Sequence, residues 1–87
     1  MMDNTNEMQI IFDSRPVNEG LARVTAAAFC TQLNPTLEEV ADLKTAVSEA
    51  VTNCIVHAYP DHIGPVTVTA AIYEGGVVRI TVSDRGV

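Results

Sequence analysis

The strongest constraint in this sequence is a pair of apolar–polar alternations on either side of a glycine-rich turn. Their apolar positions are Val66, Val68, Ala70 and Ile72 in the first segment and Val78, Ile80 and Val82 in the second. A two-residue Gly-Gly turn would pair Ile72 with Arg79 and put the two apolar rows on opposite faces. A three-residue loop, Glu74-Gly75-Gly76, pairs Ile72 with Val78 and aligns the rows. We therefore expect a hairpin of strands 66–73 and 77–83, with a left-handed glycine, Gly76, ending the loop.

The preceding residues are expected to cover the apolar face of this hairpin. Residues 8–13 alternate, which predicts a strand with Met8, Ile10 and Phe12 directed inward. Helical spacing follows over residues 17–33 and again from Leu37 to about Tyr59, just before Pro60. The order strand, helix, helix, strand, strand predicts an α+β domain with both helices on one side of an antiparallel sheet.

Two further features define the expected helices. Thr36 and Glu39 have the spacing of a capping box, which predicts the start of the second helix. The apolar stripe of each helix follows from a period of 3.6 residues. These stripes are Val17, Leu21, Val24, Ala28 and Phe29 in the first helix, and Leu37, Val40, Leu43, Val47, Val51, Cys54 and Ala58 in the second.

Composition narrows the class of protein. The 87 residues are 47% hydrophobic and 18% charged, which is typical of one core-forming domain. A net charge of −6 with scattered bases argues against a nucleic-acid partner, and no apolar run is long enough to span a membrane. Cys30 and Cys54 lie singly in apolar helical patterns, so we expect reduced core cysteines of a cytoplasmic protein. The chain stops directly after a buried-looking strand, so we expect it to be the N-terminal part of a longer protein.

Glu49 and Asn53 form the first candidate for chemistry. They are four residues apart on the side of the second helix opposite its apolar stripe. One interpretation is an ordinary solvated helix face. The other is a functional pair, in which the amide oxygen holds a hydrated Mg²⁺ and the carboxylate orients or deprotonates a nucleophile. The neighbouring Ala46 and Val56 favour the second interpretation, because ordinary exposed helix faces are rich in Lys and Glu.

Asp84 is the second candidate. It is in phase with Val82, so its side chain is expected to point toward the helix-covered side of the sheet. A carboxylate buried there without a partner would cost several kcal/mol. It is either a turn or cap residue, or an acceptor for the exocyclic amine of a ligand. Gly86, two residues later, would let the backbone approach such a ligand closely.

Residues 48–59, SEAVTNCIVHAY, resemble the N box of the GHKL ATPases, the superfamily of gyrase and the histidine kinases. Asp84-Arg85-Gly86 resembles the opening of the first glycine box of that superfamily. Residues 22–25, 32–36 and 47–53 are similar to the serine kinases that act as anti-sigma factors in sporulating bacteria. The resemblance implies a two-layer sandwich of the GHKL (Bergerat) type, of which residues 1–87 form the N-terminal part of a single ATPase domain.

The resemblance also implies roles for individual residues. Glu49 would be the catalytic base toward a serine of the protein substrate, Asn53 would bind Mg²⁺ that bridges the ATP phosphates, and Asp84 would accept from the adenine amine. Gly86 would let the backbone approach the adenine ring closely. Arg23 would contact sigma factor F and its anti-anti-sigma factor, the protein that is phosphorylated. A homodimer is implied for the full-length protein, which would regulate sporulation transcription.

Three alternatives stay open at this point. Arg23 would also fit an ordinary solvated arginine. The protein would also fit a general-stress anti-sigma kinase of the same fold, or a binding module that holds a partner protein without nucleotide. Residues 1–87 contain neither a second glycine box nor an ATP lid, so we expect the isolated chain to lack kinase activity.

Overall fold

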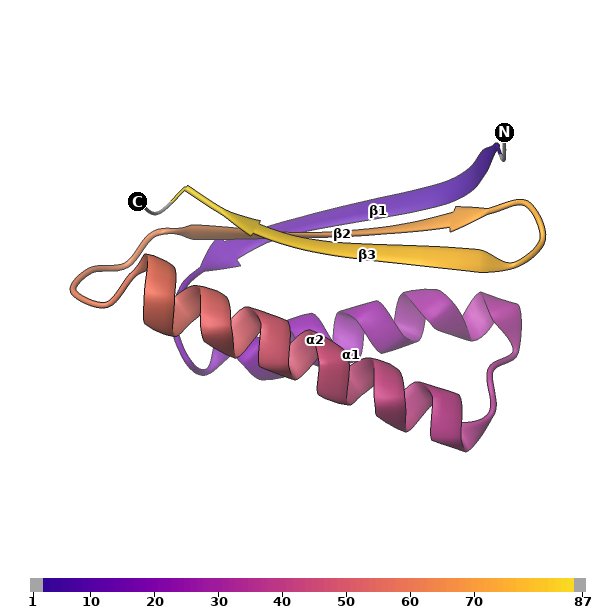
Figure 1. Ribbon diagram of the computed structural model, residues 1–87, viewed down its shortest axis with the longest axis horizontal. Helices are drawn as coiled ribbons and strands as arrows, with labels where there is room; N and C mark the ends of the chain where they lie inside the picture. Colours follow the sequence, from indigo (N-terminus) through magenta and orange to yellow (C-terminus); the bar gives the residue numbers. More distant parts are fainter. Residues whose placement is uncertain (1–2, 86–87) are drawn as a thin grey trace.

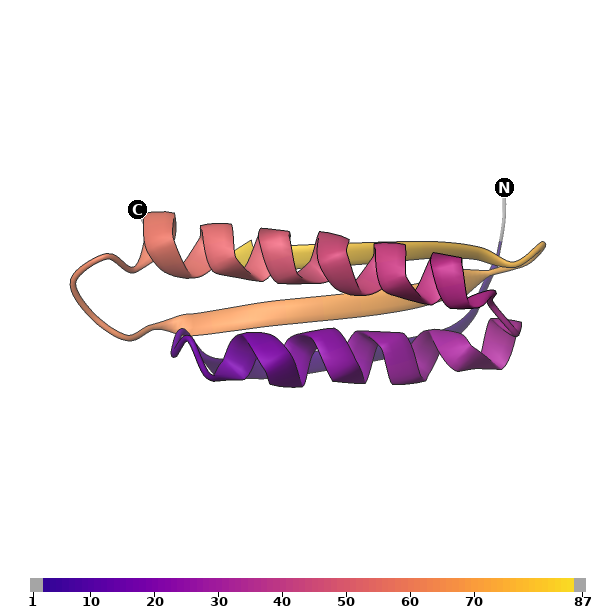
Figure 2. The same cartoon turned by 90° about the horizontal axis from the view of Figure 1, so that it is seen from below.

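The computed structural model describes residues 3–85 and contains one antiparallel sheet and two long helices (Figure 1). The sheet has the strand order β1-β2-β3, and both helices lie on the same face of it, side by side (Figure 2). The α+β class is therefore confirmed. In chain order the elements are β1 (Asn4–Asp13), α1 (Asn18–Cys30), the 3₁₀ helix η1 (Thr31–Leu33), α2 (Leu37–Ala58), β2 (Pro65–Tyr73) and β3 (Val77–Asp84).

The predicted register of the hairpin is confirmed. Ile72 pairs with Val78, and the loop between the paired residues Tyr73 and Val77 has three residues. Gly75 and Gly76 have φ angles of 86° and 80°, a region that side chains with a Cβ rarely adopt. The apolar rows of β2 and β3 therefore share one face, and this face packs on the helices.

β1 is longer than the predicted strand 8–13, because backbone pairing continues beyond the apolar alternation. It begins at Asn4 and pairs with β2 up to Tyr73, with a register irregularity between Asn4 and Asn6. The Thr5 hydroxyl also donates to the carbonyl oxygen of Ile72 at 3.2 Å. Phe12 is buried as predicted, whereas Met8 and Ile10 are half-buried.

The predicted apolar stripe of α1 is wrong. Leu21 and Val24 are 52% and 58% exposed, Val17 and Ala28 are also exposed, and only Phe29 of this stripe is half-buried. The buried face consists of small side chains, because these let the helix approach α2 and the sheet closely. It contains Ala22, Ala26, Ala27 and Cys30.

The start of α2 confirms the capping box but corrects one core residue. Thr36 accepts from the Glu39 backbone N–H at 3.1 Å, and the Glu39 carboxylate accepts from the Thr36 N–H at 2.8 Å. The Thr36 N–H, and to a lesser extent the Thr36 hydroxyl, lower the pKa of the Glu39 carboxyl group because they stabilise its charged form. Leu37 was expected in the core but is 90% exposed. The N-terminal end of α2 lies farther from the sheet than its C-terminal end (Figure 1), and of the apolar residues in its first turn only Val40 is half-buried.

The core lies where the C-terminal half of α2 meets the sheet. Val51, Val66 and Val68 are completely buried there. Cys30 and Cys54 are buried free thiols, as predicted. Within residues 3–85, no helix is both long and apolar enough to cross a membrane.

The loop after α2 is fixed by a close backbone approach. The Gly64 N–H donates to the buried Ser14 hydroxyl at 3.0 Å, and the Ser14 N–H donates to the Gly64 carbonyl at 2.9 Å. A Cβ on Gly64 would overlap the ring of Tyr59, which is only 6% exposed. This loop therefore requires glycine for space.

We predict opposite effects of alanine at two glycines. Gly64→Ala should destabilise the protein by about 1–3 kcal/mol, because the buried Tyr59 ring has to move. Gly20→Ala lies in α1, where the new Cβ would meet only the Arg23 Nη2 at 3.5 Å, and should stabilise by about 0.5–1 kcal/mol. Chemical denaturation of both variants measures this; equal stability of the Gly64→Ala variant and the parent would contradict the packing described.

Candidate functional site

The polar pair predicted on α2 lies on its exposed side. Glu49 and Asn53 are exposed and one helical turn apart, whereas Val47 and Val51 of the same helix are buried against the core. The burial of one side fixes the rotation of the helix and therefore directs both polar side chains away from the core. Their exposure leaves the carboxylate and the carboxamide accessible to a ligand.

Asp84 is joined to this helix by a side-chain contact. The Cys54 thiol, next to Asn53 in the chain, donates to Oδ2 of Asp84 at 3.4 Å. Asp84 is the last residue of β3 and pairs with Val66 of β2. As expected from its phase with Val82, Asp84 has its side chain on the helix side of the sheet. The contact thus brings the end of β3 to the turn of α2 that carries Asn53.

The Cys54 thiol is held in its protonated form. Burial raises its pKa to about 11, helped by the hydrogen bond to Asp84 and by the negative charge of that carboxylate. A protonated thiol has one weak donor, and here the carboxylate is the acceptor. Cys30 differs, because burial alone raises the pKa of its thiol.

The backbone next to Asp84 is anchored by Tyr59. The Tyr59 hydroxyl donates to the Pro65 carbonyl oxygen at 2.7 Å and accepts from the Arg85 N–H, also at 2.7 Å. The same ring meets His62 edge-on at 5.4 Å between centroids. One side chain therefore ties the first residue of β2 to the residue that follows Asp84.

Arg23 lies on α1, away from this contact, and forms an ion pair within its own helix. Its Nε is 3.3 Å from Oε2 of Glu19, but the geometry is not that of a hydrogen bond, so the attraction is Coulombic. The same Glu19 oxygen accepts from the Ser48 hydroxyl at 2.8 Å. Arg23 is thereby linked through Glu19 to the residue that precedes Glu49, and its side chain remains 43% exposed.

Glu49 and Asn53 lie on the predicted exposed face of α2, and the Asp84 side chain lies on the predicted side of the sheet. Gly86 lies outside the described residues. The roles of Tyr59 and Ser48 were missed, and Cys54 was assigned only to the core. A signal for the Cys54 contact did exist, because Cys54 and Asp84 were each expected on the interface between the helices and the sheet.

The described side chains fit the two ends of a Mg²⁺–nucleotide. Among residues 3–85, no cluster of three or more His, Cys, Asp or Glu could hold a metal by itself. An exposed carboxamide such as that of Asn53 suits Mg²⁺ that takes its other ligands from phosphate and water. The ionised Asp84 carboxylate only accepts hydrogen bonds, and the Cys54 thiol is one of its donors. It therefore suits an amine donor.

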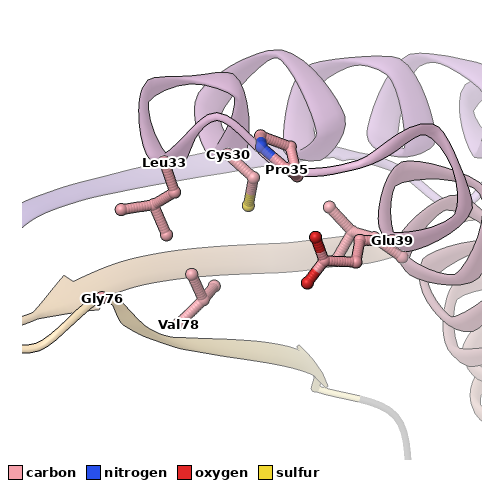
Figure 3. A pocket seen from close by; sticks show the side chains of 7 residues that line it. Cys30, Leu33, Pro35, Glu39, Gly76 and Val78 are labelled. Carbon is pink, nitrogen blue, oxygen red and sulfur yellow. The ribbon is translucent and has the colours of Figure 1, made fainter.

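Two cavities in the described part of the chain lie away from Glu49, Asn53 and Asp84. One of about 280 Å³ lies between the end of α1, the start of α2 and the β2–β3 turn, with the Glu39 carboxylate at its edge (Figure 3). Another, of about 570 Å³, lies beside the loop after α2 and includes Tyr59 and His62 in its lining. Neither is lined by the three candidate residues, which are on an open surface.

The fold and these residues define a class of protein. Residues 12–87 match the family of histidine kinase-like ATPase domains, and the chain belongs to that family. It is similar to the anti-sigma F factor of Thermoanaerobacter sp. (strain X514), with 53% identity over 85 residues that cover 98% of this chain and 59% of the relative. Anti-sigma F factors of Geobacillus kaustophilus (strain HTA426) and Bacillus thuringiensis (strain Al Hakam) are 50% and 46% identical over 82 residues, covering 94% of this chain and 56% of each relative. The chain thus resembles the anti-sigma F factors and spans less than two thirds of their length.

We predict that removal of one hydroxyl loosens the end of β3. Tyr59→Phe leaves the Pro65 carbonyl and the Arg85 N–H without their shared partner, which should cost about 1–3 kcal/mol. Hydrogen exchange of the Arg85 amide should accelerate. Tyr73→Phe is the matched control, because that ring packs under the Arg79 guanidinium at 5.7 Å on the other face of the sheet. Unchanged exchange at Arg85 in the Tyr59→Phe variant would contradict the anchoring role.

Proposed function

We propose that this chain is the part of an ATP-dependent serine protein kinase and anti-sigma factor that carries the catalytic base, the Mg²⁺ ligand and the adenine acceptor. The observation that supports this most is the contact between Cys54 and Asp84. It brings the carboxylate at the end of β3 to the helix turn that bears Asn53, so that one surface presents groups for both ends of a nucleotide. The names of the relatives support a sigma factor as the partner.

Each residue of the site has a proposed role. Glu49 accepts the proton of the substrate serine hydroxyl, Asn53 binds Mg²⁺ on the phosphates, and Asp84 accepts from the adenine amine. Bound Mg²⁺–ATP supplies the phosphoryl group and the charge neutralisation on which this reaction depends. The chain's own contribution is to hold these three groups on α2 and β3, two elements whose relative position is fixed by the core.

Arg23 is the proposed contact for protein partners. The side chain is 43% exposed, and the same helix exposes Leu21 and Val24. A cation beside exposed apolar side chains is typical of protein interfaces, where arginine is enriched and large apolar groups become buried. We propose that this surface of α1 binds sigma factor F and the anti-anti-sigma factor, the phosphorylated substrate.

The proposal extends to the full-length protein of which this chain would be a part. Residues 1–87 would form the N-terminal part of a single Bergerat-type ATPase domain, in a cytoplasmic protein that acts as a homodimer and regulates sporulation transcription. Glycine-rich phosphate contacts would come from the part of the relatives' length that this chain does not span. The isolated chain is accordingly proposed to be inactive.

We predict that substitutions of Glu49 and Asn53 in the full-length protein affect catalysis and nucleotide binding differently. Glu49→Gln should lower phosphate transfer to the substrate serine by about 10²–10⁴-fold, the usual contribution of a general base, while ATP affinity changes little. Asn53→Ala should lower Mg²⁺-dependent ATP affinity as well. Transfer is measured with radiolabelled ATP, and affinity by calorimetry.

Glu38→Gln is the matched control, because Glu38 is an exposed acid in the first turn of the same helix. It should leave both quantities unchanged. Transfer at the parent rate by the Glu49→Gln variant would exclude Glu49 as the base. A parent that binds the sigma factor without binding ATP would instead favour a nucleotide-independent binding module.

We predict that Arg23→Gln weakens sigma-factor binding by at least about tenfold without changing ATP affinity, because it removes one charge at the proposed interface. Glutamine is preferable to glutamate here, because a second carboxylate beside Glu19 would add repulsion within α1. Arg79→Gln, on the polar face of the sheet, is the control. An unchanged dissociation constant in surface-plasmon resonance would remove Arg23 from the interface.

A further inference from the structure

Cys54 has a donor role that a core cysteine does not need. It is only 9% exposed and packs in the core, yet its thiol contacts Oδ2 of Asp84 at 3.4 Å. An aliphatic side chain of similar size would fill the same space without donating a hydrogen bond. The pairing joins a buried atom of α2 to a carboxylate whose residue is exposed at the end of β3.

We propose that Cys54 is a positioning residue for nucleotide recognition, whose thiol holds the Asp84 carboxylate in the orientation that accepts the exocyclic amine of adenine. The inference rests on the proposed role of Asp84 as the adenine acceptor. Cys54 acts through Asp84 and is not itself assigned any contact with the nucleotide.

The chemistry of the thiol suits this task. It has a single proton to donate, so it engages one acceptor position of the carboxylate. Burial and the neighbouring negative charge keep the thiol protonated, with a pKa of about 11, so it remains a donor throughout the physiological range. A stronger, charged donor such as lysine at this position would neutralise the carboxylate and compete directly with the amine.

Two contacts contribute to the orientation of Asp84. Tyr59 holds the backbone of the next residue through the Arg85 N–H at 2.7 Å. Cys54 holds one carboxylate oxygen. Cys54 lies in the C-terminal half of α2, the helix that carries Asn53, and Tyr59 is the residue that directly follows this helix. The distance between the adenine end and the Mg²⁺ end of the site is therefore set by one rigid element.

The test uses full-length protein and two nucleotides, ATP and the analogue in which hydrogen replaces the 6-amino group of the base. Their affinities are measured by calorimetry for the parent and for the Cys54→Ala, Cys54→Ser and Asp84→Ala variants. Cys30→Ala is the matched control, because Cys30 is also a buried helical cysteine but lines the cavity at the other end of the molecule.

The parent should prefer ATP over the analogue, since the analogue lacks the amino group that would donate to the Asp84 carboxylate. Cys54→Ala should reduce this preference about three- to tenfold by weakening ATP binding alone, and Cys54→Ser, which keeps a donor, should retain most of it. Cys30→Ala should leave the preference unchanged.

The outcomes distinguish failure of the positioning role of Cys54 from failure of the proposed role of Asp84 as the adenine acceptor. If Asp84→Ala leaves the preference unchanged, Asp84 is not the adenine acceptor, and both claims fail. If Asp84→Ala abolishes the preference but Cys54→Ala does not reduce it, only the positioning role of Cys54 is overturned. Equal weakening of both nucleotides by Cys54→Ala would also overturn it, because that result reports a structural role alone.

Discussion

The arrangement of the site depends on the two hydrogen bonds of the Tyr59 hydroxyl. They connect the residue that follows α2 with the first residue of β2 and with the backbone just beyond β3. The ring is buried, and the space it needs is provided by Gly64 in the intervening loop. Because the last turns of α2 and the end of β3 share this anchor, the polar groups on the two elements keep a fixed relation to each other.

Small side chains provide the second condition for this arrangement. The buried face of α1 is formed by alanines and Cys30, which let the two helices lie side by side on three strands. Two larger apolar residues of α1, Leu21 and Val24, are left exposed near Arg23. A helix that is apolar on both faces is costly to expose, and this supports the proposal that the outer face of α1 binds a protein partner.

Elements with a strong local signal were predictable from the sequence. The three-residue turn followed from the two apolar rows, and the start of α2 followed from the spacing of Thr36 and Glu39. The buried face of α1 was not predictable, because its sequence has apolar residues around most of the helix and only packing selects among them. Leu37 was misplaced for a related reason, since periodicity does not show where a helix moves away from its sheet.

In the candidate site, too, some features were predictable from the sequence and others were not. The faces occupied by Glu49, Asn53 and Asp84 followed from helical and strand periodicity. The contacts that hold them did not, because the partners of Cys54, Tyr59 and Ser48 are distant in the chain or belong to other elements. Arg23 and Glu19 are four residues apart on one helix, so their ion pair could have been predicted from the sequence.

The proposed nucleotide site is tested most directly by mapping nucleotide binding on the full-length protein by NMR. Amide chemical shifts would be followed while Mg²⁺–ADP is added. If the nucleotide binds at the proposed site, the largest changes among residues 3–85 occur at 49–54 and 84–85. Changes concentrated instead around Cys30, Leu33 and Glu39, which line the cavity at the other end of α2, would contradict it.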